Sequence, residues 1–339
     1  QEGLVSLFSL DDIAVMGFVP VIARLPLLMK RIAQTAEAVV AQKPDALVII
    51  DSPDFTHRVA RIVRKSNPDI PIVNYVSPTV WAWRPGRAAK MRAYVDHLLA
   101  LLPFEPQAHE ELGGPACSYV GHPLIERCLD LRPNEAESVE REKPRLLVLP
   151  GSRRSEVARL LPVFRESIAL LVNRIGPVEI LMPCVERLAD EIARKVRDWP
   201  VPVTIIRGEA EKWAAFRTAR AALAASGTVT LELALAQVPM VTAYKVNAIE
   251  AAIARRILRL SSVILPNIIL GENIVPEFLQ DDCTPVHLSH ALLPLMQGDV
   301  PRHVQLAAFE RLEEIMRLPS GETPSLRAAQ IVLGFAKRK

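Results

Sequence analysis

The sequence predicts an α/β protein with two Rossmann-like domains facing each other across a cleft, followed by a helical C-terminal segment. Short β-branched and apolar runs alternate with helix-length amphipathic segments along most of the 339 residues. This alternation is typical of parallel sheets covered by crossover helices. A charged, turn-rich interval without a strand separates two groups of such runs, and a chain of this length is large enough for two domains.

Nine strands are expected. The first domain should hold strands at 46–50, 71–76, 97–101 and 118–120, and the second at 145–149, 178–182, 203–206, 221–225 and 239–243. The interval 129–144 (LDLRPNEAESVEREKP) is the predicted linker. The domains are therefore expected at 1–128 and 145–284, and residues 285–339 should form a helical tail.

Composition excludes several classes of protein. Half of the residues are hydrophobic and the formal charge is only +3, so neither a disordered chain nor a nucleic-acid partner is indicated. The apolar window 13–23 is shorter than the roughly 20 residues of a membrane span, and Asp11 and Asp12 stand where a signal peptide would be basic. The cysteines contain no C-x-x-C pair, so we expect reduced thiols and no metal site. They are Cys117, Cys128, Cys184 and Cys283.

The stretch ALVIIDSPDF (46–55) ends a predicted buried strand on two carboxylates. Ligands of doubly wound sheets bind beyond the carboxyl ends of the strands. Asp54 can cap the helix expected to begin near Phe55, which gives it a structural role. Asp51 is the last strand residue and has no such role. A carboxylate at this position can accept a proton from a substrate hydroxyl, so Asp51 is a candidate general base.

Two loops of the second domain have the composition of phosphate-binding sites. In LPGSRRSEV (149–157) a strand leads through Gly151 and Ser152 to a helix, with Arg153 beside them. Free backbone N–H groups at a helix start, a hydroxyl and a guanidinium can hold a phosphate. An ordinary turn with a capping serine explains the same residues.

The loop ASGTVTLE (225–232) repeats this strand, loop and helix pattern with Ser226, Gly227 and Thr228. It places Glu232 one turn beyond Thr228 on the same helix face. Two such loops in one domain suggest a nucleoside diphosphate, with Glu232 free to bind ribose hydroxyls. An exposed helical glutamate without a ligand is the alternative.

A fourth loop, YVSPTVWAWR (75–84), carries two tryptophans and is followed by a basic helix. This combination could stack on nucleic acid. Because aromatic residues are only 5% of the chain, a sugar-facing wall or packing between domains is the preferred interpretation.

Taken together, these stretches resemble one family, the lipid-A-disaccharide synthases, which are bacterial glycosyltransferases of the GT-B fold. The similar stretches run in order from near Asp12 to Gln280. They are AVMGFVPVIARLP, DSPDF, YVSPTVWAWRPGR, LPFE, VGHPL, LPGSRRSEV, ASGTVTLELAL, PMVTAYK and LPNIILGENIVPEFLQ. No single stretch is specific, but their combination is.

The resemblance implies an inverting transfer in lipid A biosynthesis. The 2,3-diacylglucosamine unit of UDP-2,3-diacylglucosamine would move to the 6-hydroxyl of 2,3-diacylglucosamine 1-phosphate, releasing UDP. The essential acid of the family's D-x-P-D-F motif falls on Asp51. Arg153 and the two loops would offset charge on the departing diphosphate, and Asn267 in LPN is a further donor-site candidate. No cofactor or metal is implied.

The resemblance also implies a location and an assembly. The enzyme is expected to be cytoplasmic and peripheral on the inner face of the inner membrane of a Gram-negative bacterium, and to be a homodimer through its helical tail. Apolar residues near the N-terminus could face the membrane or simply pack on the sheet. They are Phe18, Val19, Val21, Ile22, Leu25, Leu28 and Met29.

The chain departs from the family at its start. Family members open with a strand and a G-E-x-S-G-D loop, and nothing like it precedes Leu10. A truncated sequence is the expected reason. A non-catalytic UDP-sugar-binding module and a UDP-sugar 2-epimerase remain the rival hypotheses. An epimerase should show additional acids and a set of histidines at the sugar, whereas His57, His97, His109 and His122 are scattered.

Overall fold

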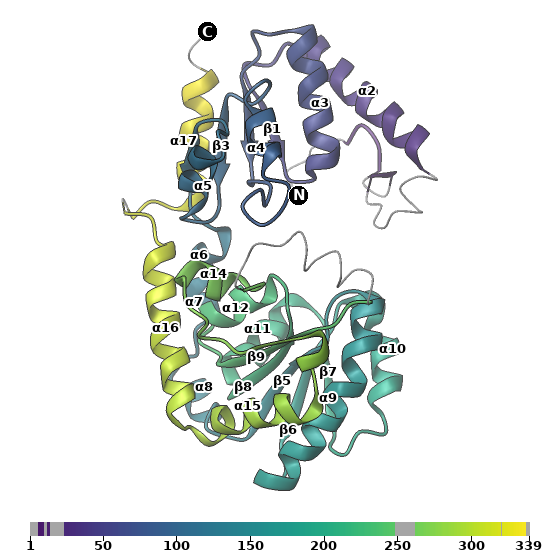
Figure 1. The fold of residues 1–339 in the computed structure, drawn as a ribbon, viewed down its shortest axis with the longest axis vertical. Helices are drawn as coiled ribbons and strands as arrows, with labels where there is room; N and C mark the ends of the chain where they lie inside the picture. Colours follow the sequence, from purple (N-terminus) through teal and green to yellow (C-terminus); the bar gives the residue numbers. More distant parts are fainter. Residues whose placement is uncertain (1–5, 10–11, 14–23, 248–261, 320, 337–339) are drawn as a thin grey trace. The chain divides into compact units, whose positions relative to one another are not determined.

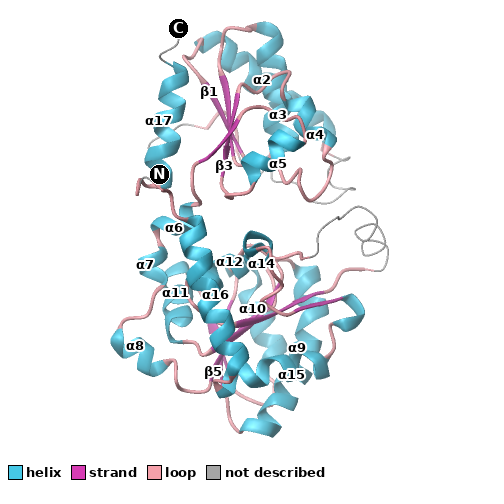
Figure 2. Ribbon diagram, turned by 60° about the vertical axis from the view of Figure 1, so that its left-hand side comes forward, coloured by secondary structure: helices cyan, strands magenta, loops and turns pink. Residues whose placement is uncertain are grey.

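The computed structural model describes residues 6–9, 12–13, 24–247, 262–319 and 321–336. The chain divides into two compact units, which we call unit 1 (residues 1–122 and 318–339) and unit 2 (residues 123–317). Each unit holds a parallel sheet with helices packed against it (Figures 1 and 2). The predicted α/β architecture with two sheets is confirmed.

Unit 1 is built on a four-stranded parallel sheet in the order β1-β2-β3-β4. The strands are β1 (Leu47–Ile50), β2 (Ile72–Tyr75), β3 (His97–Ala100) and β4 (Cys117–Tyr119). The helices are α2 (Leu25–Gln42), α3 (Pro53–Ser66), α4 (Gly86–Met91), α5 (Glu105–Glu111) and α17 (Pro324–Ala336).

Alternating strand residues bury the two faces of this sheet. Ile72 and Leu98 belong to a core shared with α2 and α3. Their neighbours Val73 and Leu99 point to the other face and pack against apolar residues of α17. Because successive side chains of a strand point to opposite faces, both faces need a cover, and the C-terminal helix provides the second one.

Unit 2 is built on a six-stranded parallel sheet in the order β10-β9-β8-β5-β6-β7. The strands are β5 (Arg145–Leu149), β6 (Glu179–Pro183), β7 (Val203–Ile206), β8 (Ala221–Ala225), β9 (Met240–Tyr244) and β10 (Glu277–Leu279). The first helices are α6 (Pro123–Glu126), α7 (Cys128–Leu131), α8 (Glu135–Glu140), α9 (Arg154–Ile175), α10 (Glu186–Val196) and α11 (Glu209–Thr218). They are followed by α12 (Val229–Leu235), α14 (Leu265–Leu270), the 3₁₀ turn η2 (Gln280–Asp282), α15 (Pro285–Gln297) and α16 (Val300–Met316).

The strand order of unit 2 reverses between β5 and β8. From β5 the chain adds β6 and then β7 on one side, and β8, β9 and β10 extend the sheet on the other. At such a switch point the loops after the two central strands lead away from each other and leave a crevice. The loops that follow β5 and β8 are the two predicted phosphate-binding loops.

All nine predicted strands form, each within one residue of its expected ends. The strand β10, which pairs with β9 at the edge of the sheet, was not predicted.

The predicted linker is wrong, since residues 129–144 belong to unit 2. They form part of α7 and all of α8, and the buried Arg141 fixes them. Its guanidinium donates to the carbonyl oxygens of Phe216, Arg217, Ala236 and Gln237 at the ends of α11 and α12. The helical tail is also divided, because α15 and α16 lie in unit 2 and α17 in unit 1.

No helix among the described residues combines the length and apolar character that crossing a bilayer requires. Phe18, Val19, Val21 and Ile22, predicted to face a membrane, lie outside the described residues.

Candidate active site

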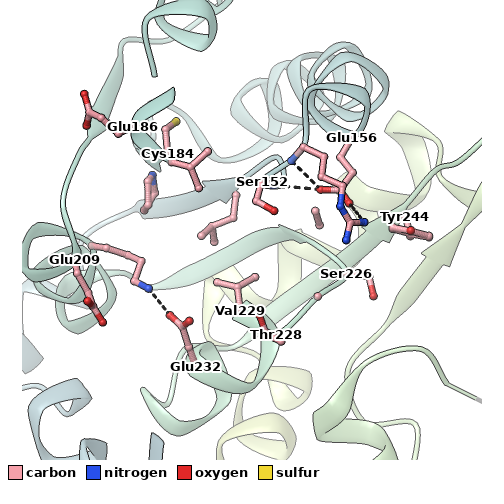
Figure 3. Close-up of a pocket in the computed structure, with 18 of the residues that line it drawn as sticks. Ser152, Glu156, Cys184, Glu186, Glu209, Ser226, Thr228, Val229, Glu232 and Tyr244 are labelled. Atoms are coloured by element: carbon pink, nitrogen blue, oxygen red, sulfur yellow. Dashed lines mark hydrogen bonds and ion pairs between the residues drawn. The ribbon is translucent and has the colours of Figure 1, made fainter. Parts of the chain in front are cut away.

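A cavity of about 850 Å³ opens at the switch point of unit 2. The loops that follow β5, β6, β7 and β8 contribute to its lining, together with Tyr244 at the end of β9 (Figure 3). The lining includes every predicted donor-site residue except Asn267. These residues are Gly151, Ser152, Arg153, Ser226, Gly227, Thr228 and Glu232.

The loop after β5 is folded around a carboxylate that the sequence reading did not single out. Glu156 is 8% exposed, and its Oε2 accepts hydrogen bonds from the backbone N–H groups of Ser152 and Arg153, both at 3.2 Å. Its Oε1 accepts from Arg153 Nη1 at 2.9 Å. Figure 3 shows these contacts as dashed lines.

The expectation of free N–H groups in this loop is therefore wrong for Ser152 and Arg153. Glu156, the third residue of α9, accepts from the backbone N–H of the N-cap residue Arg153, which is the glutamate half of a capping box. Gly151 has a φ of +105°, and a Cβ on it would lie 2.6 Å from Glu156 Oε2. Glycine is required here both by its backbone conformation and by the carboxylate.

The loop after β8 leaves more room. The Ser226 N–H donates to the Ala243 carbonyl of β9 at 3.0 Å, and Thr228 is the N-cap residue of α12. A Cβ on Gly227 would meet no atom within 4 Å. Gly227 and Thr228 are exposed to the cavity, so a ligand can approach this backbone closely.

Glu232 is not the exposed helical residue of the alternative interpretation. Its side chain is 18% exposed, and Lys212 Nζ on α11 lies 2.6 Å from its Oε2. Both residues line the cavity, and Figure 3 shows the Glu232 carboxylate turned toward this contact. A carboxylate held by a lysine accepts hydrogen bonds from hydroxyl groups without leaving an unpaired buried charge.

Asn267 has a structural position and does not line the cavity. It is 2% exposed. Its Nδ2 donates to the Val275 carbonyl and to Glu277 Oε1, both at 2.9 Å. Its Oδ1 accepts from the N–H groups of Ile274 and Val275. The amide is thus fully used in fixing the chain before β10, and its prediction as a donor-site residue finds no support in this geometry.

Asp51 lies in unit 1, directly after β1, and is exposed. Its backbone is tied at both ends, because its N–H donates to the Tyr75 carbonyl at 3.2 Å and its carbonyl accepts from Thr56 Oγ1 at 2.7 Å. Its φ is +49° and that of Ser52 is +44°. Two consecutive non-glycine residues in this region are uncommon, and such strain is concentrated at functional sites.

The prediction that Asp54 caps α3 is wrong. The N-cap residue is Ser52, with Pro53 at the first helical position and no side-chain capping bond. The helix starts earlier than expected because proline is favoured at this position. Asp54 instead lies in the first turn and pairs with Arg87 of α4 at 2.8 Å.

The tryptophan loop of unit 1 is fixed from α5 by polar residues that the sequence reading missed. Glu105, 3% exposed, accepts hydrogen bonds from Trp81 Nε1 at 3.1 Å and from two backbone N–H groups. His109 Nε2 lies 2.8 Å from Ser77 Oγ. Burial raises the pKa of Glu105.

The second tryptophan of this loop, Trp83, is 39% exposed. The Arg84 guanidinium stacks on it, 4.1 Å from the ring centroid.

Several cavity residues carried too little sequence signal to be found. Lys212, Cys184 and Glu209 follow no motif, and only the folded sheet brings them to one place. Glu156 carried little signal as well, because a capping box has Ser or Thr three residues before the glutamate and Arg153 stands there.

The described residues contain no group of three His, Cys, Asp or Glu side chains that could hold a metal ion. No histidine is among the described residues that line the cavity. Burial lowers the pKa of His57 and of His122 to about 4, so both are neutral at pH 7. Buried, neutral histidines outside the cavity suit a structural role better than the proton transfer that an epimerase needs.

Two parallel-sheet units, one with a cavity lined by glycine-containing loops at its switch point, define the GT-B fold class. The solved structure of MurG from Acinetobacter baumannii shares this fold with a TM-score of 0.56 and 14% identity, covering 92% of this chain and 79% of that one. A UDP-forming trehalose-phosphate synthase from Burkholderia xenovorans has a TM-score of 0.56 and 11% identity over 93% of this chain and 79% of its own.

The chain belongs to the lipid-A-disaccharide synthetase family, whose model matches residues 1–330. A lipid-A-disaccharide synthase from Rhodopseudomonas palustris strain HaA2 is 55% identical over all of this chain and 86% of its own length. One from Nitrobacter hamburgensis is 55% identical over 98% of this chain and 84% of its own. The predicted family, GT-B fold and glycosyltransferase activity in lipid A biosynthesis are therefore confirmed.

Proposed function

We propose that the chain condenses UDP-2,3-diacylglucosamine with 2,3-diacylglucosamine 1-phosphate and releases UDP with inversion at the anomeric carbon. The observation that carries this proposal is the cavity at the switch point of unit 2, where the Gly-Ser-Arg and Ser-Gly-Thr loops meet. Family membership supports a UDP-sugar and a lipid-linked substrate, and the cavity supports the proposed binding of the nucleoside diphosphate of the donor in unit 2.

Each loop has a distinct role in this proposal. Arg153 contacts the diphosphate, and the backbone around Gly227 and Thr228 approaches it from the other loop. Glu232, oriented by Lys212, accepts hydrogen bonds from the ribose hydroxyls. Asp51 removes the proton from the acceptor 6-hydroxyl as that oxygen attacks the anomeric carbon. The proton transfer and the attack then occur together, and UDP leaves with its charge offset by Arg153.

The experiment measures UDP release with both acylated sugars present, for the wild type and for Asp51→Asn. A general base typically contributes 10²- to 10⁴-fold, so the rate should fall by about that factor. UDP affinity should stay unchanged, because Asp51 belongs to unit 1 and the donor cavity to unit 2. Undiminished turnover in Asp51→Asn would refute the role of Asp51. Wild-type binding of UDP without turnover would favour the non-catalytic module.

The proposal includes a peripheral position on the inner face of the inner membrane and a homodimer. Leu25 and Met29 on α2 are 44% and 47% exposed, and Lys30 beside them is exposed. Exposed apolar side chains next to a cation suit the interface of an anionic bilayer. Leu28 is half-buried, so it offers less apolar surface to a membrane than Leu25 and Met29 do. The dimer rests on the family resemblance and is tested by the molar mass in solution.

A further inference from the structure

The contacts of Glu156 determine which groups of the loop after β5 can bind a phosphate. The backbone N–H groups of Ser152 and Arg153, which lie just before the first residue of α9, already donate to Glu156 Oε2. A helix N-terminus attracts anions, and here the anion is part of the chain. The Glu156 side chain is 11% exposed whereas that of Arg153 is 53% exposed. A ligand entering the cavity therefore meets the guanidinium more readily than the carboxylate.

The loop is also held from outside α9. Arg187 Nη2 on α10 donates to the Ser152 carbonyl at 2.9 Å. Gly151 leaves space for the carboxylate, since a Cβ there would lie 2.9 Å from Glu156 Cβ and 2.6 Å from its Oε2. The loop thus has one tightly fitted arrangement. The ion pair with Glu156 uses one N–H of Arg153, and a guanidinium has five.

We propose that Glu156 is a positioning residue of the donor site. Its carboxylate occupies the Ser152 and Arg153 N–H groups and orients the Arg153 guanidinium, so that the guanidinium rather than those N–H groups contacts the donor diphosphate. This inference rests on the proposed function. It assigns the first loop a charged side chain as a phosphate ligand, beside the close backbone contact that the loop of Gly227 and Thr228 allows.

The test measures UDP binding by calorimetry for the wild type, Glu156→Gln, Arg153→Ala and the double variant. Glutamine has the same shape and retains an acceptor for the backbone N–H groups, but it loses the charge that orients Arg153. We expect each single variant to weaken UDP binding about tenfold, the scale of one charge-assisted hydrogen bond. If Glu156 acts through Arg153, the double variant binds no more weakly than Arg153→Ala alone. Glu156→Gln should also raise the KM for the donor more than it lowers kcat.

The control is Glu191→Gln, which removes the carboxylate partner of the adjacent Arg154. Glu191 does not line the cavity, so UDP affinity should be unchanged. Thermal unfolding of every variant is recorded in parallel, because a purely structural cap would lower Tm and leave UDP affinity intact.

Three results overturn the inference. Unchanged UDP affinity in Glu156→Gln makes Glu156 only a helix cap, and tighter binding makes it a competitor that the diphosphate displaces. Additive losses in the double variant show that Glu156 does not act through Arg153. If Glu156→Gln does not fold, a structure of the wild type with bound UDP tests the inference instead. Glu156 should remain on both N–H groups, and a phosphate in its place refutes the inference. Absence of UDP binding in the wild type would instead refute the proposed function itself.

Discussion

Asn267 and Asp54 show how the role of a residue depends on partners that its own sequence neighbourhood does not reveal. Asp54 was predicted to cap a helix, and Asn267 was a donor-site candidate through the family resemblance of its LPN segment. In the structure Asn267 makes three hydrogen bonds to the backbone before β10 and a fourth to the side chain of Glu277 in β10. Asp54 pairs with Arg87, which is 33 residues away in the chain. The Asp54 side chain is 81% exposed, although that of Arg87 is only 21% exposed, so loss of this pair should cost about 0.5 kcal/mol rather than the value of a cap.

Asn267→Ala should destabilise unit 2 by about 3 kcal/mol. The substitution leaves the N–H groups of Ile274 and Val275 and the Val275 carbonyl without their side-chain partner, and each buried unsatisfied group is costly. The measurement is urea unfolding followed by a probe in unit 2. Asn67→Ala is the control, because Asn67 accepts a single hydrogen bond at an exposed site. An Asn267→Ala midpoint equal to that of the wild type would contradict this role.

At the scale of elements, the division of the helical tail is the main finding. The sequence predicts one tail at 285–339, yet α15 packs on α9 within the core of unit 2. The last helix, α17, covers Val73, Leu99 and Val120 of the sheet of unit 1. Amphipathic periodicity shows that a helix has an apolar face, but it does not show which sheet that face covers.

Ile331→Asp in α17 should destabilise unit 1 by about 3 kcal/mol, because it removes apolar burial and places a charge against the sheet. Leu333→Asp is the matched control, since Leu333 lies on the same helix but is 55% exposed. Limited proteolysis should cleave unit 1 of Ile331→Asp faster and leave unit 2 intact. Equal cleavage of the two variants would show that α17 does not cover unit 1.

At the scale of the whole molecule, membrane association is the property most open to test. We expect the double variant Leu25→Glu, Met29→Glu to bind anionic vesicles about tenfold more weakly, since it removes two exposed apolar side chains and adds negative charge. Co-sedimentation with vesicles containing anionic lipid measures this. The control is Val139→Glu, which changes a 66% exposed residue of unit 2. If the wild type and both variants bind the vesicles equally, α2 does not contact the membrane.

The sequence by itself determined the α/β class, nine strands to within one residue of their ends, the family, and seven of the residues that line the cavity. These features are local, because strand runs and the loops that follow them are written in consecutive residues. Only the tertiary structure decided that residues 129–144 belong to unit 2, that α17 covers unit 1, and that Lys212 meets Glu232. It also showed that Glu156 already holds the N–H groups of Ser152 and Arg153 just before α9. Such pairings depend on how buried groups find partners across the fold, and no short stretch of sequence contains both members.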